Sequence, residues 1–96
     1  MTEKDIEKQL VVSTRTAGGM APKLVSPGFD GIPDRLILMP GGRIGFVEVK
    51  APGKRLRPLQ EKRKRQLEAL GFSAFVLDGV EQIPEILTAI QGGGER

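Results

Sequence analysis

Apolar residues recur at helical spacing at the start of the chain. Within residues 2–18, Ile6 and Leu10 fall on one side of a helix. Thr2 and Asp5 have the spacing of a capping box, in which side chain and backbone satisfy each other at the first turn. Two glycines close the segment, so we predict one helix over 2–18.

Three short apolar runs follow, and each is bounded by turn-forming residues. Residues 20–25 predict a short strand, which Pro22 places at a sheet edge because proline has no backbone N–H group. A loop at 26–33 leads into two further strands, 34–39 and 43–50, which are joined by a Pro-Gly-Gly turn. We therefore predict three strands in succession.

The second half of the chain predicts a helix, a strand and a final helix. Residues 51–58 form a basic loop, and 59–71 form a helix with a narrow apolar stripe. The apolar strand 72–78 is expected to pair in parallel with the hairpin through the preceding helix, in the right-handed sense. A last helix over 82–91 has isoleucine and leucine at i, i+3, i+4 and i+7.

This αβββαβα order predicts an α/β domain whose mixed four-stranded sheet is flanked by helices. We expect one domain over residues 1–91 and a flexible tail at 92–96, since 96 residues suit a single domain. No apolar run reaches the roughly 18–20 residues that cross a bilayer, and the first ten residues do not resemble a signal peptide. We therefore expect a cytoplasmic protein without a membrane partner.

The chain contains no cysteine and no histidine, which narrows its possible chemistry. Disulfides, thiolate metal sites, imidazole zinc sites and nucleophile–histidine triads are excluded. Any bound metal must be a hard cation held by oxygen atoms, and Mg²⁺ or Mn²⁺ is the expected type.

Positive charge is concentrated in one segment. The net charge is +3, and residues 54–65 hold seven of the fifteen lysines and arginines. This segment is either a phosphate-binding surface or a solvated helix face. With four phenylalanines and no tyrosine or tryptophan, base stacking is not expected to dominate. Contact with the backbone of duplex or branched nucleic acid fits better.

Three charged residues interrupt the hairpin strands. Glu48 and Lys50 point to the same face of their strand because side chains alternate. A three-residue turn would align Asp34 with Glu48, with Cβ atoms about 5 Å apart. A shift of two residues would align Asp34 with Lys50 instead. A two-residue turn would send Asp34 to the opposite face unless a bulge corrected it.

Two adjacent carboxylates repel each other unless a divalent cation lies between them. A metal-assisted hydrolytic site explains all three charges, with Lys50 orienting water or stabilising phosphate charge. The alternative is an exposed face of cross-strand ion pairs in which Asp34 closes a turn. Glu3 and Glu7 lie on the same side of the first helix as Ile6, so either is a candidate third acid.

The segments GIPDRLIL, GFVEVKAPG and LRPLQEKRKRQLEALGF resemble the VRR-NUC family of the PD-(D/E)XK nuclease superfamily, in the family's order and over most of the chain. The resemblance implies a restriction-endonuclease-like fold. The small size is similar to stand-alone members from phages and bacteria, so a bacterial cell or phage-infected host is the implied location.

The resemblance also implies an endonuclease that uses Mg²⁺ or Mn²⁺. Asp34, Glu48 and the backbone carbonyl of Val49 would bind the metal, and Lys50 would be the catalytic lysine. Glu3 would be the first-helix acid, with Glu7 as the fallback. The site residues implied in total are Glu3, Asp34, Glu48, Val49, Lys50 and Gln60, the last at the start of its helix.

Stand-alone members of this family are similar to homodimeric Holliday-junction resolvases, which implies four-way DNA as substrate. Nucleases acting on flaps or nicks, and a DNA-binding module without activity, are the alternatives. Arg57 replaces a small hydroxyl residue of many relatives. Lys23 and Ser26 fall where phosphate contact is expected, although a solvated lysine and a turn serine are equally simple explanations. The DNA-binding candidates are Lys23, Ser26, Lys54, Arg55, Arg57, Lys62, Arg63 and Arg65.

Overall fold

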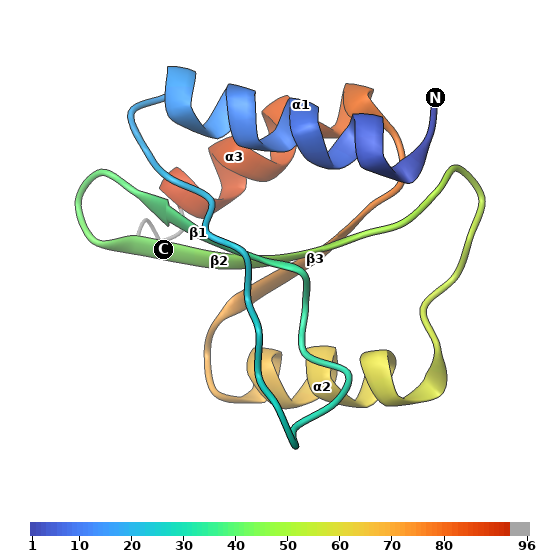
Figure 1. The fold of residues 1–96 in the computed structure, drawn as a ribbon. Helices are drawn as coiled ribbons and strands as arrows, with labels where there is room; N and C mark the ends of the chain where they lie inside the picture. Colours follow the sequence, from blue (N-terminus) through green and yellow to red (C-terminus); the bar gives the residue numbers. More distant parts are fainter. Residues whose placement is uncertain (93–96) are drawn as a thin grey trace.

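The computed structural model describes residues 1–92, and the last four residues of the predicted tail, 93–96, lie outside that range (Figure 1). Helices and strands alternate along the chain in an α/β arrangement. In order, the elements are α1 (Glu3–Thr16), β1 (Arg35–Met39), β2 (Arg43–Val49), α2 (Pro58–Ala69), β3 (Ser73–Leu77), a 3₁₀ turn η1 (Val80–Gln82) and α3 (Ile83–Gln91).

Helix α1 begins at the predicted capping box. The Thr2 hydroxyl accepts a hydrogen bond from the Asp5 N–H at 3.1 Å, and the Asp5 carboxylate accepts one from the Thr2 N–H at 3.0 Å. The hydrogen bonds that the Asp5 carboxylate accepts from the Thr2 N–H and the Thr2 hydroxyl lower the pKa of Asp5. The helix ends before Gly18, which adopts a left-handed conformation with φ of 91°.

Strands β1 and β2 form the predicted hairpin with the register of a three-residue turn. Met39 pairs with Arg43 and Arg35 with Val47. Both glycines of the turn adopt positive φ, 83° at Gly41 and 75° at Gly42, which residues with a side chain rarely accept. Continuing this register by one residue places Asp34 opposite Glu48, as the first of the predicted alignments requires.

Strand β3 pairs with β2 in parallel, as predicted from the helical crossover. Glu48 is aligned with Val76, and Val49 with Leu77. The strand order is β1-β2-β3. Strand β2 is therefore the central strand, and its carboxyl-terminal end carries Glu48 and leads into Lys50.

The predicted four-stranded sheet is wrong, because the part of the chain described here contains three strands. Residues 20–25 run beside β1 but form only two isolated bridges, Met20 to Leu38 and Lys23 to Arg35. Pro22 accepts a hydrogen bond from Leu36 at 3.0 Å but has no N–H to return. The missing donor interrupts the ladder at the position where a continuous strand would need it.

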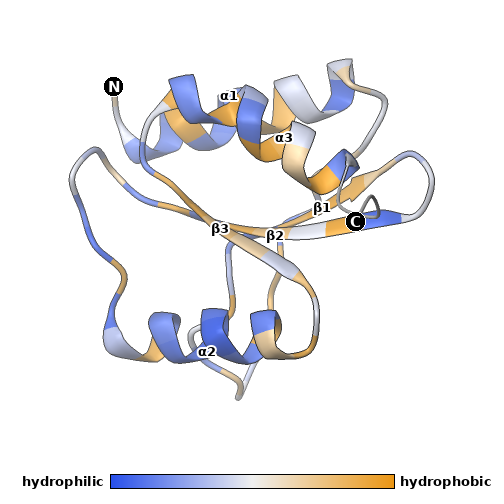
Figure 2. Ribbon diagram, turned by 180° about the vertical axis from the view of Figure 1, so that it is seen from behind, coloured by the Kyte–Doolittle hydropathy of each residue, from blue (hydrophilic) through white to orange (hydrophobic). Residues whose placement is uncertain are grey.

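Helices α1 and α3 cover one face of the sheet, and α2 lies on the other (Figure 1). The buried residues of α1 and α3 are apolar except for Thr14, whereas α2 is largely hydrophilic (Figure 2) and its buried residue is Gln60. Most of the hydrophobic core therefore lies on the α1/α3 side. Its buried residues include Ile6, Leu10, Ile37, Val47, Val49, Leu77, Ile83, Ile86 and Ile90.

Gly45 allows α3 to approach the sheet closely. A Cβ atom at this position would lie 2.5 Å from Ile90 Cδ1, so the absence of a side chain sets the distance between β2 and α3. No helix within residues 1–92 combines the length and hydropathy needed to cross a bilayer.

Candidate active site

The first acid of the site is fixed by the backbone of the neighbouring strand. Asp34 stands one residue before β1, and its Oδ2 accepts a hydrogen bond from the Val49 N–H at 2.9 Å. The carboxylate occupies the place where a backbone carbonyl would continue the antiparallel ladder. This hydrogen bond ties Asp34 to the end of β2, beside Glu48.

Glu48 is the most deeply buried acid of this site, with 7% of its surface exposed. Its Oε2 accepts a hydrogen bond from Gln60 Nε2 at 2.8 Å and lies 3.8 Å from Lys50 Nζ. Its Oε1 is buried and has no hydrogen-bond partner within the described residues. A carboxylate oxygen in that state has lost its hydration without replacement, which is costly for the ionised group.

This environment changes the acidity of Glu48. Burial, and next the charge of Asp34, raise the pKa of the Glu48 carboxyl from an ordinary 4.5 to about 7; Lys50 opposes the shift and Glu3 adds to it. A positive ion bound between the two carboxylates would offset both causes. Titratable groups whose pKa values are strongly shifted occur most often at functional sites.

Lys50 lies against Glu48 and is largely withdrawn from solvent. Its side chain is 15% exposed, and its backbone N–H donates to the Leu77 carbonyl at 2.8 Å. The second contact continues the β2–β3 pairing past the end of β2. Because the backbone is held and the ammonium faces one carboxylate, Lys50 is restricted to the region of the acids.

The two candidate acids of α1 have different surroundings. Glu7 Oε2 accepts a hydrogen bond from Arg35 Nε at 2.8 Å and lies 3.7 Å from Lys23 Nζ. Glu3 is exposed, and its charge acts on Glu48. Glu7 is thus already paired with cations, whereas Glu3 adds negative charge that acts on Glu48. Within residues 1–92 no three carboxylates lie close enough to form one metal cluster, so Glu3 does not join Asp34 and Glu48 as a direct third ligand here.

The donors present fit a hard divalent cation. Asp34 and Glu48 offer oxygen atoms only, they repel each other, and Glu48 Oε1 is buried with no partner in the described part of the chain. Oxygen ligands with an excess of negative charge are what Mg²⁺ and Mn²⁺ prefer. The backbone carbonyl of Val49 remains the expected further ligand.

Gln60 connects the site to helix α2. Its Nε2 donates to Glu48, while its Oε1 accepts a hydrogen bond from the Arg57 N–H at 2.8 Å. Arg57 is the N-cap of α2, so one side chain both satisfies a free helix N–H and orients an acid. The glutamine lies three residues after the N-cap, which is the position from which Glu and Gln commonly reach back. That spacing is the sequence signal for this second role.

The predicted DNA-binding residues do not form one uniform surface. Lys54, Arg55, Arg57, Lys62 and Arg65 are exposed. Ser26 is half-buried in a turn where its carbonyl accepts a hydrogen bond from the Phe29 N–H.

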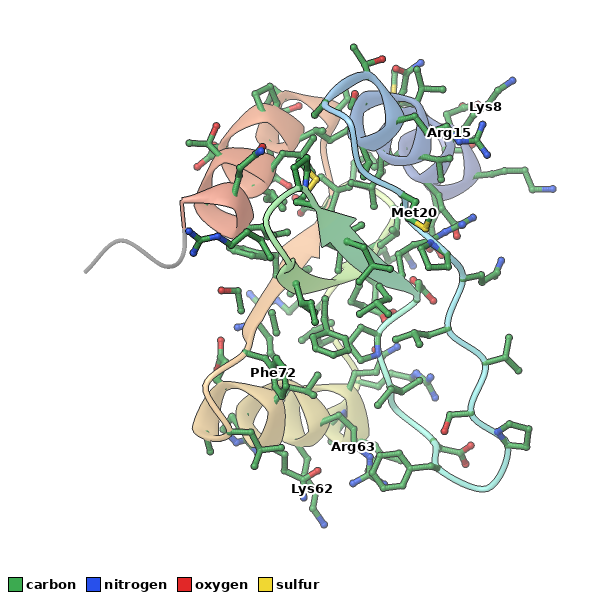
Figure 3. The ribbon with its side chains drawn as sticks, turned by 90° about the vertical axis from the view of Figure 1, so that its left-hand side faces the viewer. Lys8, Arg15, Met20, Lys62, Arg63 and Phe72 are labelled. Carbon is green, nitrogen blue, oxygen red and sulfur yellow. The ribbon has the colours of Figure 1, made fainter. Side chains whose placement is uncertain are left out.

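Arg63 has a structural contact that the sequence did not reveal. Its guanidinium lies 3.8 Å from the centre of the Phe29 ring, and its Nε donates to the Asp30 carbonyl at 2.8 Å (Figure 3). The arginine therefore fastens the 26–32 loop to α2. The pairing of Arg35 with Glu7 was also missed, because the two residues are 28 positions apart and no local pattern connects them.

Comparisons with known proteins identify the family of this chain. The VRR-NUC domain model matches residues 7–81. The chain belongs to the VRR-NUC family. A protein named "Putative nuclease p44", from Acyrthosiphon pisum secondary endosymbiont phage 1, is 48% identical over 88 residues, covering 92% of this chain and 94% of its own. A solved "VRR_NUC domain" structure matches with a TM-score of 0.84 and 27% identity, covering 92% of this chain and 97% of that one.

Replacing Gln60 with alanine is expected to lower both the stability and the nuclease rate of this VRR-NUC domain. The change leaves Glu48 Oε2 and the Arg57 N–H without the amide that contacts both. We expect a loss of about 1–3 kcal/mol in the free energy of unfolding and a decrease of about 10–100-fold in nuclease rate. Urea unfolding and single-turnover cleavage measure the two effects.

Gln66→Ala is the matched control, because Gln66 belongs to the same helix and accepts only an exposed hydrogen bond from Arg63. Its expected effect on the free energy of unfolding is within about 0.5 kcal/mol. Equal effects of the two substitutions would contradict a special role for Gln60.

Proposed function

We propose that this VRR-NUC domain is a metal-dependent endonuclease that hydrolyses phosphodiester bonds in branched DNA. The observation that carries the proposal is Glu48 Oε1, which is buried beside Asp34 without a hydrogen-bond partner among residues 1–92, with the Lys50 ammonium 3.8 Å from the other Glu48 oxygen. Membership of the VRR-NUC family and the name of the phage relative both support nuclease activity.

Each residue has a definable task in this reaction. Asp34, Glu48 and the Val49 carbonyl would hold Mg²⁺ or Mn²⁺, and Glu3 would act through water. When bound, such an ion polarises a phosphate oxygen and lowers the pKa of water. Lys50 orients the attacking water and offsets negative charge that develops on the phosphate. Gln60 keeps Glu48 in place, and Lys23, Ser26 and the exposed cations of residues 54–65 bind the DNA backbone.

The chemical change is a simple hydrolysis. The water oxygen forms a bond to phosphorus while the bond between phosphorus and the leaving oxygen breaks. The water gives up a proton, and the leaving oxygen gains one. The first proton leaves to solvent and the second is taken from solvent, while the Lys50 ammonium, 3.8 Å from Glu48 Oε2, orients the water and offsets negative charge on the phosphate.

The preferred substrate that we propose is a four-way junction cut by a homodimer. Resolving a junction needs two matched cuts, and a two-fold pair of identical sites supplies them with the fewest components. Few side chains near the site are suited to reading base edges, so DNA shape is the expected basis of selection. The phage relative is consistent with action in an infected bacterial cell.

A panel of labelled substrates tests this proposal. Four-way junction, flap, nicked and linear duplex DNA are incubated with the protein in Mg²⁺, Mn²⁺ or EDTA. We expect cleavage only with a divalent ion, fastest on the junction, with paired cuts on opposite strands. Faster cleavage of another substrate than of the four-way junction would reject the junction preference. Absence of cleavage above the EDTA control on every substrate would reject the nuclease activity.

A further inference from the structure

A second positively charged surface lies away from the basic segment at 54–65. Helix α1, the segment at 20–24 and the start of β1 enclose a groove of about 410 Å³. We call it the α1 groove. Five cations and one carboxylate line it, together with two valines: Lys4, Glu7, Lys8, Val11, Val12, Arg15, Lys23 and Arg35.

The cations of α1 form a stripe along one side of the helix. At 100° per residue, Lys4, Lys8 and Arg15 fall within about 40° of one another. From Lys4 to Arg15 the stripe runs about 16 Å along the helix axis. Lys8 and Arg15 project from the same side of α1 (Figure 3). This length spans several phosphates of one DNA strand, which are spaced about 3.4 Å apart along the duplex axis.

The single acid of the groove is already neutralised. Glu7 is bound by Arg35 at 2.8 Å and lies 3.7 Å from Lys23, whose side chain is 63% exposed. Arg35 also donates to the Ala21 carbonyl, so it serves as an internal support. In the described part of the chain, Lys4, Lys8 and Arg15 form no ion pair, and their charges face solvent.

The corresponding groove beside α2 is less uniformly positive. It is lined by Arg55, Lys64 and Arg65 together with Glu61 and Glu68. Lys64 Nζ lies 2.7 Å from Glu68 Oε2. The segment with the highest density of lysine and arginine in the sequence therefore contributes a mixed surface there, whereas the α1 groove has unpaired cations and no free acid.

The α1 groove and the acidic site use neighbouring residues of the same two segments. Arg35 follows Asp34, and Lys4 follows Glu3, whose charge acts on Glu48. Helix α2 lies on the other face of the sheet (Figure 1). The segment that carries the acids thus lies between the α1 groove, where Arg35 binds Glu7, and helix α2, where Gln60 binds Glu48. A straight duplex that follows one surface leads away from the other, whereas two arms that diverge at a branch can occupy both.

We propose that the α1 groove binds the phosphate backbone of a second DNA arm and thereby gives branched DNA its advantage over linear duplex. This inference rests on the proposed function, because it assigns a substrate arm to the same site. It adds a surface, built from Lys4, Lys8 and Arg15, that the basic segment at 54–65 does not include.

The test is a triple variant, Lys4→Gln, Lys8→Gln and Arg15→Gln, which removes three charges and keeps helix-compatible side chains. Binding is measured in EDTA as a function of salt, on a four-way junction and on linear duplex of equal arm length. We expect at least a tenfold loss of junction affinity and less than a threefold loss for linear duplex. The salt slope for the junction should decrease in magnitude by about 2–3, at roughly 0.9 for each lost contact.

A matched variant, Arg55→Gln, Lys62→Gln and Arg65→Gln, removes three exposed charges on the α2 side. We expect it to weaken binding of linear duplex and junction alike. Unchanged junction affinity in the α1-groove variant, or equal losses on both substrates, would overturn the second-arm assignment. Melting temperatures of both variants, compared with the native protein, establish that each is folded.

The same experiment separates this inference from the proposed function. Cleavage of the junction by the native protein with Mg²⁺ or Mn²⁺ is measured in parallel. If the native protein cleaves no DNA, the proposed function fails. If it cleaves and binds DNA but the α1-groove variant binds the junction equally well, only the second-arm assignment fails.

Discussion

Replacing Lys50 with alanine is expected to reduce the rate of phosphodiester cleavage by about 10²–10⁴-fold, the range found when a positioned proton-transfer group is removed. Lys50 Nζ lies 3.8 Å from Glu48 Oε2, and its side chain is largely buried beside the acids. DNA binding in EDTA should change by less than about threefold, because exposed cations elsewhere supply most of the backbone contacts. Single-turnover cleavage and a binding titration on the same junction measure both quantities.

Arg43→Ala is the matched control for this substitution. It also removes one positive charge, but at the start of β2 beside the hairpin turn, whereas Lys50 follows the last residue of that strand. We expect its cleavage rate to remain near that of the native protein. Cleavage by Lys50→Ala at the native rate would contradict the role given to this lysine. An equal decrease of the cleavage rate in Arg43→Ala would show that the decrease comes from the loss of any positive charge and not from the position of Lys50.

Replacing Glu48 with glutamine is expected to abolish cleavage and, without a metal, to stabilise the fold. Glutamine keeps the shape of the side chain and can still accept the hydrogen bond from Gln60. It removes the buried charge and the repulsion with Asp34 that raise the pKa of Glu48 to about 7. Above pH 7 we expect a gain on the order of 1–3 kcal/mol in the free energy of unfolding.

The pH dependence of this effect has a definite sign. Between about pH 4.5 and 7 the native state holds a proton on Glu48 that the unfolded chain releases. The stability associated with the protonated group is therefore complete below pH 4.5 and is lost as the pH rises through 7. Urea unfolding in EDTA at pH 5 and pH 8 should show this loss for the native protein, and a smaller one for Glu48→Gln.

Added Mg²⁺ or Mn²⁺ provides the complementary measurement. At pH 8 the ion should raise the stability of the native protein, because a ligand that binds only the folded state shifts the unfolding equilibrium. Glu48→Gln should gain less. The native protein and Glu48→Gln could instead have the same free energy of unfolding at pH 8 in EDTA. The ionised Glu48 carboxylate would then not destabilise the fold, and the argument for a cation between the two acids would fail.

The arrangement of the acids was predictable because it depends on local rules. The Pro-Gly-Gly turn needs three residues when both glycines adopt positive φ, and that length alone aligns Asp34 with Glu48. Side-chain alternation then places Lys50 on the same face as Glu48. The capping box of α1 was predictable from the spacing of Thr2 and Asp5. The parallel pairing of β3 was predictable because a helical crossover joins it to the hairpin.

Features that depend on contacts between distant residues were not predictable. The apolar run at 20–25 looks like a strand, and the effect of Pro22 on its pairing appears only when Leu36 is opposite it. Arg63 belongs to a basic run in the sequence, yet Phe29 and Asp30 approach it from a loop more than thirty positions away. In both cases the structure that forms depends on the residue opposite in space, which the sequence pattern does not identify.

The Val49 N–H group, which donates to Asp34 rather than to a strand carbonyl, gives the site a built-in spectroscopic probe. Its proton exchanges with solvent only when the ends of β1 and β2 separate, and that separation also takes Asp34 away from Glu48. The deuterium-exchange rate of this one amide therefore reports how often the pair of acids is assembled, with no substrate and no catalytic turnover required.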